Sequence, residues 1–187
     1  MVRDAAATRS RILDAAFKEF ATYGLAGARI DRIAEAAAAN KRSIYVYFEH
    51  KEGLFNAVMR QVVEEVSEAV PLDVEDLPGY AGRLFDYWLA HPEVMRLMLW
   101  IQLERPAESP EGRAAYRRKV ESLTRTKGAL PRGISATDLI VMVMGLTNGW
   151  FLVDDSLRSA DGADPHAPER IARHRAALVE AVRRICA

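Results

Sequence analysis

Apolar residues recur at helical spacing along almost the whole of this 187-residue sequence. Near the N-terminus, Ile12, Ala16 and Phe20 fall on one face of a predicted helix, and similar stripes continue to Ile185. This period of about 3.6 residues predicts amphipathic helices, whereas half-buried strands alternate with a period of two. Because strand patterns are scarce, the sequence predicts an all-α protein.

Turn and cap residues divide this pattern into helices. The first is expected to be capped by Thr8 and to stop at Gly24, and the second covers residues 30–37. The remaining helices are expected at residues 51–70, 78–90, from 91, at 110–127, from Ser135 and at 168–185. The stretch "PLDVEDLPGY" carries two prolines and a glycine, which is typical of a joint between two parts of a chain.

One stretch, "SIYVYF" at residues 43–48, departs from this pattern because its β-branched and aromatic residues alternate as in a strand. A lone strand without a partner is not a stable element. A short helix with Asn40 as its N-cap is the better interpretation, because Ile44 and Phe48 then face inward together. Lys41, Arg42 and the two tyrosines are left outward or at the edges.

Residues 30–48 therefore form two helices joined by a tight turn, and the second helix is basic and aromatic. A helix-turn-helix of this kind places its second helix in the DNA major groove. Residues 1–51 carry nine lysines and arginines against six acids, a net charge of +3, although the chain is neutral overall. Exposed cations and tyrosine hydroxyls bind phosphates. The alternative is that the tyrosines are ordinary half-buried aromatics and that Arg29 is a solvated charge.

Residues 8–59 resemble the DNA-binding domain of the TetR/AcrR family of transcriptional regulators. The motifs that carry the resemblance are "RILDAAFKEFATYG", "IDRIAEAA" and "SIYVYFEHKEGLF", with their spacing. The resemblance implies a helix-turn-helix domain at residues 1–52, and a helical effector-binding and dimerisation domain at 53–187. The helix at 51–70 would be the lever between them. The resemblance implies DNA contacts at Lys41, Ser43, Tyr45, Tyr47 and Lys51, and it places Asn40 at the start of the recognition helix. Arg29 and Arg42 are further candidates for DNA binding because both are cationic.

Three positions depart from the family pattern. Ala28 stands where the family usually has threonine, which removes a side-chain cap and a phosphate contact. Ala38 stands in the turn where glycine is usual, and alanine lacks the freedom of glycine to adopt positive φ. Arg42 replaces a small residue, and either a guanine contact or a phosphate contact would suit its guanidinium.

The second half of the chain supplies candidates for a dimer interface and for an effector pocket. The apolar helix at residues 139–153 and one stripe of the last helix are expected to meet a second copy, because a helix-turn-helix that reads a palindrome needs a two-fold dimer. The stripe consists of Ile171, His174, Leu178, Ala181, Val182 and Ile185. Methionines and aromatics suit a pocket for a lipophilic or aromatic molecule; the candidates are Trp88, Met95, Leu99, Trp100, Leu103, Met142, Leu146, Asn148, Trp150 and Phe151. In both cases the alternative is that these residues are simple core.

These features together predict a homodimeric repressor that a small effector releases from a palindromic operator. The alternatives are a helix-turn-helix protein without an effector, and an activator. An enzyme has little support, since no nucleophile–base set and no Gly-rich phosphate loop is present. The acidic loop at residues 154–170 matches no metal motif, so neither a metal nor a cofactor is expected. The N-terminus lacks the apolar core of a signal peptide, no run is long enough to span a membrane and there is one cysteine, so we expect a cytoplasmic protein.

Overall fold

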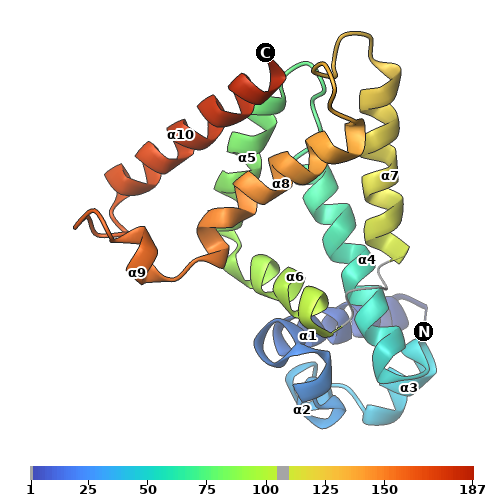
Figure 1. The fold of residues 1–187 in the computed structure, drawn as a ribbon. Helices are drawn as coiled ribbons and strands as arrows, with labels where there is room; N and C mark the ends of the chain where they lie inside the picture. Colours follow the sequence, from blue (N-terminus) through green and yellow to red (C-terminus); the bar gives the residue numbers. More distant parts are fainter. Residues whose placement is uncertain (1, 105–109) are drawn as a thin grey trace. The chain divides into compact units, whose positions relative to one another are not determined.

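The structure is a computed structural model, and it describes residues 2–104 and 110–187, with side chains for 5–104 and 112–187. These residues form helices α1 to α10 and contain no strand (Figure 1), which confirms the all-α prediction. The stretch at residues 43–48 lies inside a helix, so its alternation of side chains does not mark a sheet. In chain order the helices are α1 Val2–Gly27, α2 Ile30–Ala36, α3 Lys41–Phe48, α4 Lys51–Ala69, α5 Leu77–Ala90, α6 Pro92–Glu104, α7 Pro110–Arg125, α8 Ala136–Leu152, α9 Asp155–Arg158 and α10 Pro168–Cys186.

The N-terminal end of α1 differs from the prediction. The helix begins at Val2 instead of near Thr8, because alanine-rich sequence continues a helix easily. The Thr8 hydroxyl accepts a hydrogen bond from Arg11 Nη2 at 3.3 Å. At its other end, α1 turns sharply at Gly24, where φ is 68° and ψ is −179°.

The chain forms two compact units. The first contains Met1–Val66 and His91–Gly112, and the second contains Ser67–Ala90 and Arg113–Ala187. The sequence prediction placed the boundary after residue 52, so the observed division differs at two places. Most of α4 belongs to the first unit, and α6 joins it as well because α6 packs on α1.

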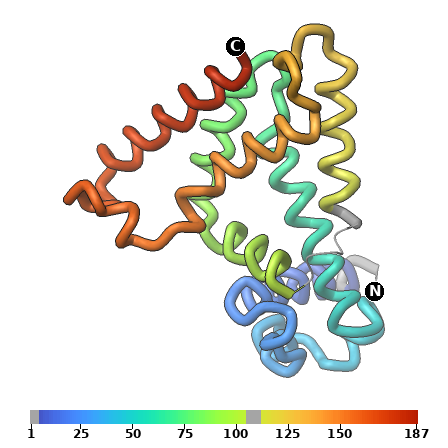
Figure 2. The backbone as a smooth tube through the Cα atoms, viewed as in Figure 1, coloured from blue at the N-terminus to red at the C-terminus, as the bar shows by residue number. Residues whose placement is uncertain are grey.

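The core of the first unit lies between α1, α2, α3 and α4, whose backbone runs through the blue to cyan part of the chain in Figure 2. Phe20 of α1 meets Phe55 of α4 edge to face, with ring centroids 5.0 Å apart. Ile33 and Ile44 are fully buried in the same core. Burying each such side chain is worth about 1.5–3 kcal/mol, so this packing fixes how α3 sits on α1 and α2.

The core of the second unit is centred on α5, which packs against α10 and α8. In Figure 1, α10 runs beside α5. Tyr80, Phe85 and Val182 are fully buried there. On the surface of the same contact, the guanidinium of Arg175 makes a two-pronged ion pair with the carboxylate of Asp86, with Nε–Oδ1 and Nη2–Oδ2 distances of 2.7 Å.

Candidate nucleic-acid interface

The turn between α2 and α3 has the geometry of a helix-turn-helix. The Asn40 side chain accepts a hydrogen bond from the backbone N–H of Arg42 at 2.9 Å, which confirms Asn40 as the N-cap of α3. Just before it, Ala38 has a φ of 47°, in the left-handed region that side chains disfavour. The chain therefore makes the tight turn without the usual glycine, at a cost in strain.

The α3 helix buries one face and exposes the other. Ile44 and Phe48 lie in the core, whereas Arg42, Tyr45 and Val46 are exposed. Ser43 and Tyr47 are half-buried at the edge of the exposed face. A shallow pocket of about 270 Å³ opens on this face, lined by Asn40, Arg42, Ser43, Val46 and Tyr47. Hydrogen-bond donors thus surround an apolar side chain on a helix of a width that a major groove admits.

Lys41 is placed differently from the other predicted contacts. Its ammonium lies 2.8 Å from Oδ1 of Asp31 on α2, and this hydrogen-bonded pair raises the pKa of Lys41. The pair joins α2 to α3 across the turn. Lys41 therefore stays charged, and its charge is already partly neutralised by the neighbouring carboxylate.

Lys51 and Arg29 lie at the corner where α1 leads into α2. The Lys51 ammonium donates to the backbone carbonyls of Ala26 at 3.3 Å and Ala28 at 3.2 Å. Arg29 has an exposed side chain, and its backbone N–H donates to Oε1 of Glu19 at 2.8 Å. Two of the three donors of the Lys51 ammonium thus hold the corner, which leaves one for a phosphate.

Glu19 and Arg32 form an ion pair that the sequence pattern did not predict. Glu19 is only 9% exposed, and its Oε1 accepts from Arg32 Nε at 2.8 Å as well as from Arg29. The guanidinium of Arg32 also lies over the ring of Tyr23, 4.2 Å from its centroid. The sequence shows that Glu19 lies next to the apolar stripe of α1. It does not show that Arg32, beyond the turn, is the partner of Glu19. The pair orients the start of α2 and hence of α3.

The predicted effector residues are divided between the two units. Met95, Leu99, Trp100 and Leu103 belong to the first unit, and the other six belong to the second. Leu103 is 76% exposed, and Met142 and Leu146 lie on the exposed face of α8. The assignment of these three residues to an effector pocket stays a prediction. The apolar sequence of α8 is long, but one face of this helix is exposed.

Trp88, Asn148, Trp150 and Phe151 lie in the interior of the second unit or at its edge. Trp88 is 3% exposed, and its Nε1 has no hydrogen-bond partner among the described residues; the same holds for Oδ1 of Asn148. Buried polar atoms are normally paired. Both atoms are therefore exceptions to that rule within the described part of the second unit.

The predicted dimer stripe of α10 faces the core of its own unit. Leu178 and Val182 are buried there, so the prediction that these two meet a second copy is corrected. His174 packs between Phe85 and Trp150, with centroid distances of 5.5 Å and 4.4 Å. Its burial, aided by nearby Arg170, lowers the pKa of His174. Ile171, Ala181 and Ile185 are half-buried.

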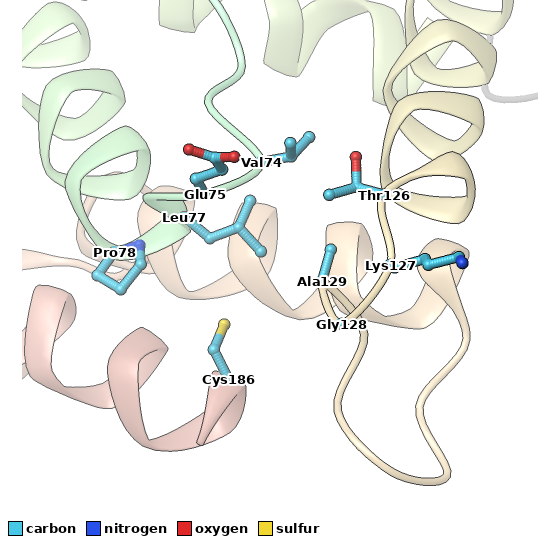
Figure 3. Close-up of a pocket in the computed structure, with 9 residues that line it drawn as sticks. All are labelled: Val74, Glu75, Leu77, Pro78, Thr126, Lys127, Gly128, Ala129 and Cys186. Atoms are coloured by element: carbon cyan, nitrogen blue, oxygen red, sulfur yellow. The ribbon is translucent and has the colours of Figure 1, made fainter.

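A second pocket, of about 240 Å³, lies within the second unit between the start of α5, the end of α7 and the end of α10. Figure 3 shows the Cys186 thiol pointing toward Leu77 and Pro78. Burial raises the pKa of this thiol, which keeps it protonated. None of the predicted effector residues lines this pocket.

Two further findings concern metals and membranes. Among the side chains of residues 5–104 and 112–187, no group of three or more His, Cys, Asp or Glu residues is placed to hold a metal ion. In the same residues, no helix is both long and apolar enough to cross a bilayer.

Comparisons with known proteins agree with this geometry. Residues 12–58 match the family model of bacterial regulatory proteins of the tetR family, and residues 76–184 match a tetracyclin repressor-like C-terminal domain. The chain is 41% identical over 157 residues to the HTH-type transcriptional repressor SCO4008 of Streptomyces coelicolor, covering 81% of each protein. The structure matches that of the transcriptional regulator SCO4942 of the same species with a TM-score of 0.79 and 35% identity, over 95% of this chain and 97% of the other.

NalD, the secondary repressor of the MexAB-OprM efflux pump in Pseudomonas aeruginosa, shares the fold with a TM-score of 0.65 at 21% identity, over 97% of both chains. The two family models cover both the helix-turn-helix and most of the rest of the chain. Members of this family are DNA-binding transcription factors and not enzymes. The chain belongs to the TetR family of bacterial transcriptional regulators.

Proposed function

We propose that the protein is a homodimeric repressor, which reads a palindromic operator with α3 and leaves it when a small lipophilic or aromatic molecule binds. The observation that carries the proposal is the exposed face of α3. It presents Arg42, Tyr45 and Ser43 around Val46, while Asn40 caps the helix. Such a face suits phosphates and base edges in a major groove.

A two-fold dimer would bring two such helices to half-sites one turn of DNA apart, about 34–36 Å, or a multiple of it. The exposed apolar face of α8 is the better candidate for the dimer contact than the buried part of the α10 stripe. Val141, Met142 and Leu146 are exposed there, with Gly145 between them. Exposed apolar patches on small proteins commonly mark interfaces. The half-buried Ile171, Ala181 and Ile185 of α10 stay within the proposal as neighbours.

The effector site is proposed for the interior of the second unit, where Trp88 Nε1 and Asn148 Oδ1 lack hydrogen-bond partners among the described residues and where Trp150 and Phe151 supply aromatic surface. A ligand with one acceptor and one donor on an apolar body would satisfy both atoms. α4 is one continuous helix that starts in the first unit and ends in the second, so it supports the role of a lever. Ligand and operator would then oppose each other reciprocally.

The dimer part is tested by the oligomeric state and by operator binding together. Val141→Glu places a charge in the proposed contact, and Leu103→Glu is the matched control at an exposed apolar residue of the first unit. We expect Val141→Glu to be monomeric in analytical ultracentrifugation and to bind a single half-site no worse than the control does. If Val141→Glu forms dimers as tightly as the wild type does, the proposed α8 contact is wrong.

The effector part is tested by a panel of lipophilic and aromatic compounds, with thermal unfolding as the first readout. A compound that binds the folded protein raises Tm, and it should also release operator DNA. Trp88→Phe and Asn148→Ala should weaken both effects together. A compound that raises Tm without changing operator affinity would contradict the coupling.

A further inference from the structure

We propose that Val46 is the residue of α3 that selects a thymine, through the C5-methyl group that thymine presents in the major groove. The inference rests on the proposed function, since it assumes that α3 enters that groove. Val46 is 72% exposed, more than any other large apolar side chain of α3. Val46 is neither basic nor aromatic, so it is not among the DNA-binding residues expected from the sequence.

The position of Val46 on α3 points its side chain directly away from the core of the first unit. Ile44 and Phe48 are buried and define the inward direction of the helix. At 100° per residue, Val46 projects almost opposite to the midpoint between those two residues. When the inward face of α3 rests on its own unit, Val46 is therefore the side chain aimed most directly at the floor of a groove.

Val46 is an apolar side chain with polar side chains around it. Val46 shares one pocket with Arg42 and Ser43, which flank it on the helix surface, and with Asn40 and Tyr47. Lys41, which is also exposed, is paired with Asp31. Val46 thus offers no hydrogen bond, while the donors beside it suit phosphates or neighbouring bases.

The chemistry of the groove then identifies the base. Guanine and adenine present hydrogen-bonding atoms across the major groove, and cytosine presents an amino donor. A branched apolar side chain would strip water from these groups without replacing their hydrogen bonds. Thymine alone among the four standard bases carries a methyl group there, and that group gains from burial against valine.

The test replaces thymine by deoxyuridine, one position at a time, in an operator selected from random duplexes with the wild-type protein. Removing the methyl group deletes one apolar contact and leaves every hydrogen-bonding group of the base in place. We expect one position in each half-site where this change weakens wild-type binding about fourfold, and about fifteenfold when both half-sites are changed. Val46→Ala should bind the thymine and deoxyuridine duplexes almost equally, whereas Ser43→Ala should keep the wild-type ratio.

Two results would overturn the inference while the proposed function stands: tolerance of deoxyuridine at every position by the wild type, or an unchanged thymine preference in Val46→Ala. Recovery of no selected sequence at all would overturn the proposed function and this inference together. A circular dichroism melt of Val46→Ala, an exposed substitution, should match that of the wild type. A loss of helix in that melt would mean that Val46 serves the fold instead of the readout.

Discussion

The carboxylate of Glu104 lies 2.6 Å from the backbone N–H of Leu25, across 79 residues of sequence. It also accepts from the next N–H, that of Ala26, at 3.2 Å. The last residue of α6 thus binds α1 just after its sharp turn at Gly24. The Lys51 ammonium donates to the neighbouring backbone carbonyls of Ala26 and Ala28. At this corner of the DNA-binding unit, Glu104 therefore binds backbone N–H groups and Lys51 binds backbone carbonyls.

Replacing Glu104 should weaken the first unit. Removing an ionised acceptor from two backbone donors is expected to lower the free energy of unfolding by about 2 kcal/mol in Glu104→Ala, and by roughly half as much in Glu104→Gln. Urea denaturation measures the change. Gln102→Ala, at an exposed residue of the same helix, is the control, and equal losses in the two alanine variants would show that the carboxylate contributes nothing.

Gly24→Ala should be more damaging than the loss of Glu104. The φ of 68° and ψ of −179° are accessible essentially to glycine alone. An added Cβ would lie 2.6 Å from Oε1 of Glu104 and 2.8 Å from Cε3 of Trp100. We expect a loss of about 3 kcal/mol or more in urea denaturation.

Gly162→Ala separates the two causes of that loss. Gly162 also has a positive φ, of 79°, but a Cβ there would meet nothing within 4 Å. Backbone strain alone should cost about 1 kcal/mol at that site. If the two alanine variants lose the same free energy, the close packing of α6 on Gly24 carries no weight.

Ala38→Gly should stabilise the protein, against the usual effect of glycine. Relief of the left-handed strain at φ 47° is worth about 1–2 kcal/mol, and the greater freedom of glycine in the unfolded chain offsets about 0.4–1 kcal/mol of it. The expected gain is about 0.5–1 kcal/mol in thermal or urea unfolding. Ala36→Gly, inside α2, should instead lose up to about 1 kcal/mol, and a loss in both variants would contradict the strain at Ala38.

The buried phenol of Tyr80 should make stability fall at high pH. Burial raises the pKa of Tyr80 to about 12, above an ordinary value of about 10. Between these values the unfolded phenol loses its proton and the folded one keeps it, so stability present below pH 10 is lost as pH rises toward 12. The full effect is roughly 2–3 kcal/mol.

Lys119, which donates to the Tyr80 hydroxyl at 2.5 Å, acts in the opposite direction. Burial lowers the pKa of Lys119, so the folded state releases that proton first and gains stability until the unfolded lysine has titrated near pH 10.5. Above about pH 10.5 the contribution of Lys119 levels off, and the fall in stability reflects Tyr80 together with Tyr116, whose pKa is also raised by burial. In urea titrations, Tyr80→Phe should flatten the fall there, and Tyr45→Phe, at an exposed phenol, should not; identical profiles would refute the assignment.

The sequence predicted the features that depend only on residues close together in the chain. Asn40 was predicted as the N-cap of α3, and its side chain accepts the expected backbone hydrogen bond. A helix was expected from Ser135, and the Ser135 side chain caps α8. Burial of Ile44 and Phe48 followed from their spacing alone. The resemblance of residues 8–59 to a known family then indicated that the exposed face of α3 meets DNA.

Features that depend on distant parts of the chain were not readable. The contact of Glu104 with Leu25 needs α6 to lie on α1, and no local pattern specifies which acid will meet which amide. In α10, periodicity indicated which stripe is apolar, but it does not distinguish the core of the same protomer from a second copy. For that reason Leu178 and Val182 were assigned to an interface although they pack inside their own unit.

The central claim is that α3 binds a specific DNA sequence, and salt-dependent binding tests it most directly. Wild type, Arg42→Ala and Arg132→Ala, an exposed control in the second unit, would be titrated with DNA upstream of the protein's own gene and with a scrambled duplex. We predict selective binding by the wild type, retained in Arg132→Ala. Arg42→Ala should bind the operator about tenfold more weakly than the wild type does. If only binding to the operator is weakened, Arg42 contacts guanine. If binding to both duplexes is weakened, and the salt slope falls by about one per subunit, Arg42 contacts a phosphate. Equal wild-type affinity for the two duplexes, and for every duplex in a genome-wide selection, would contradict the account.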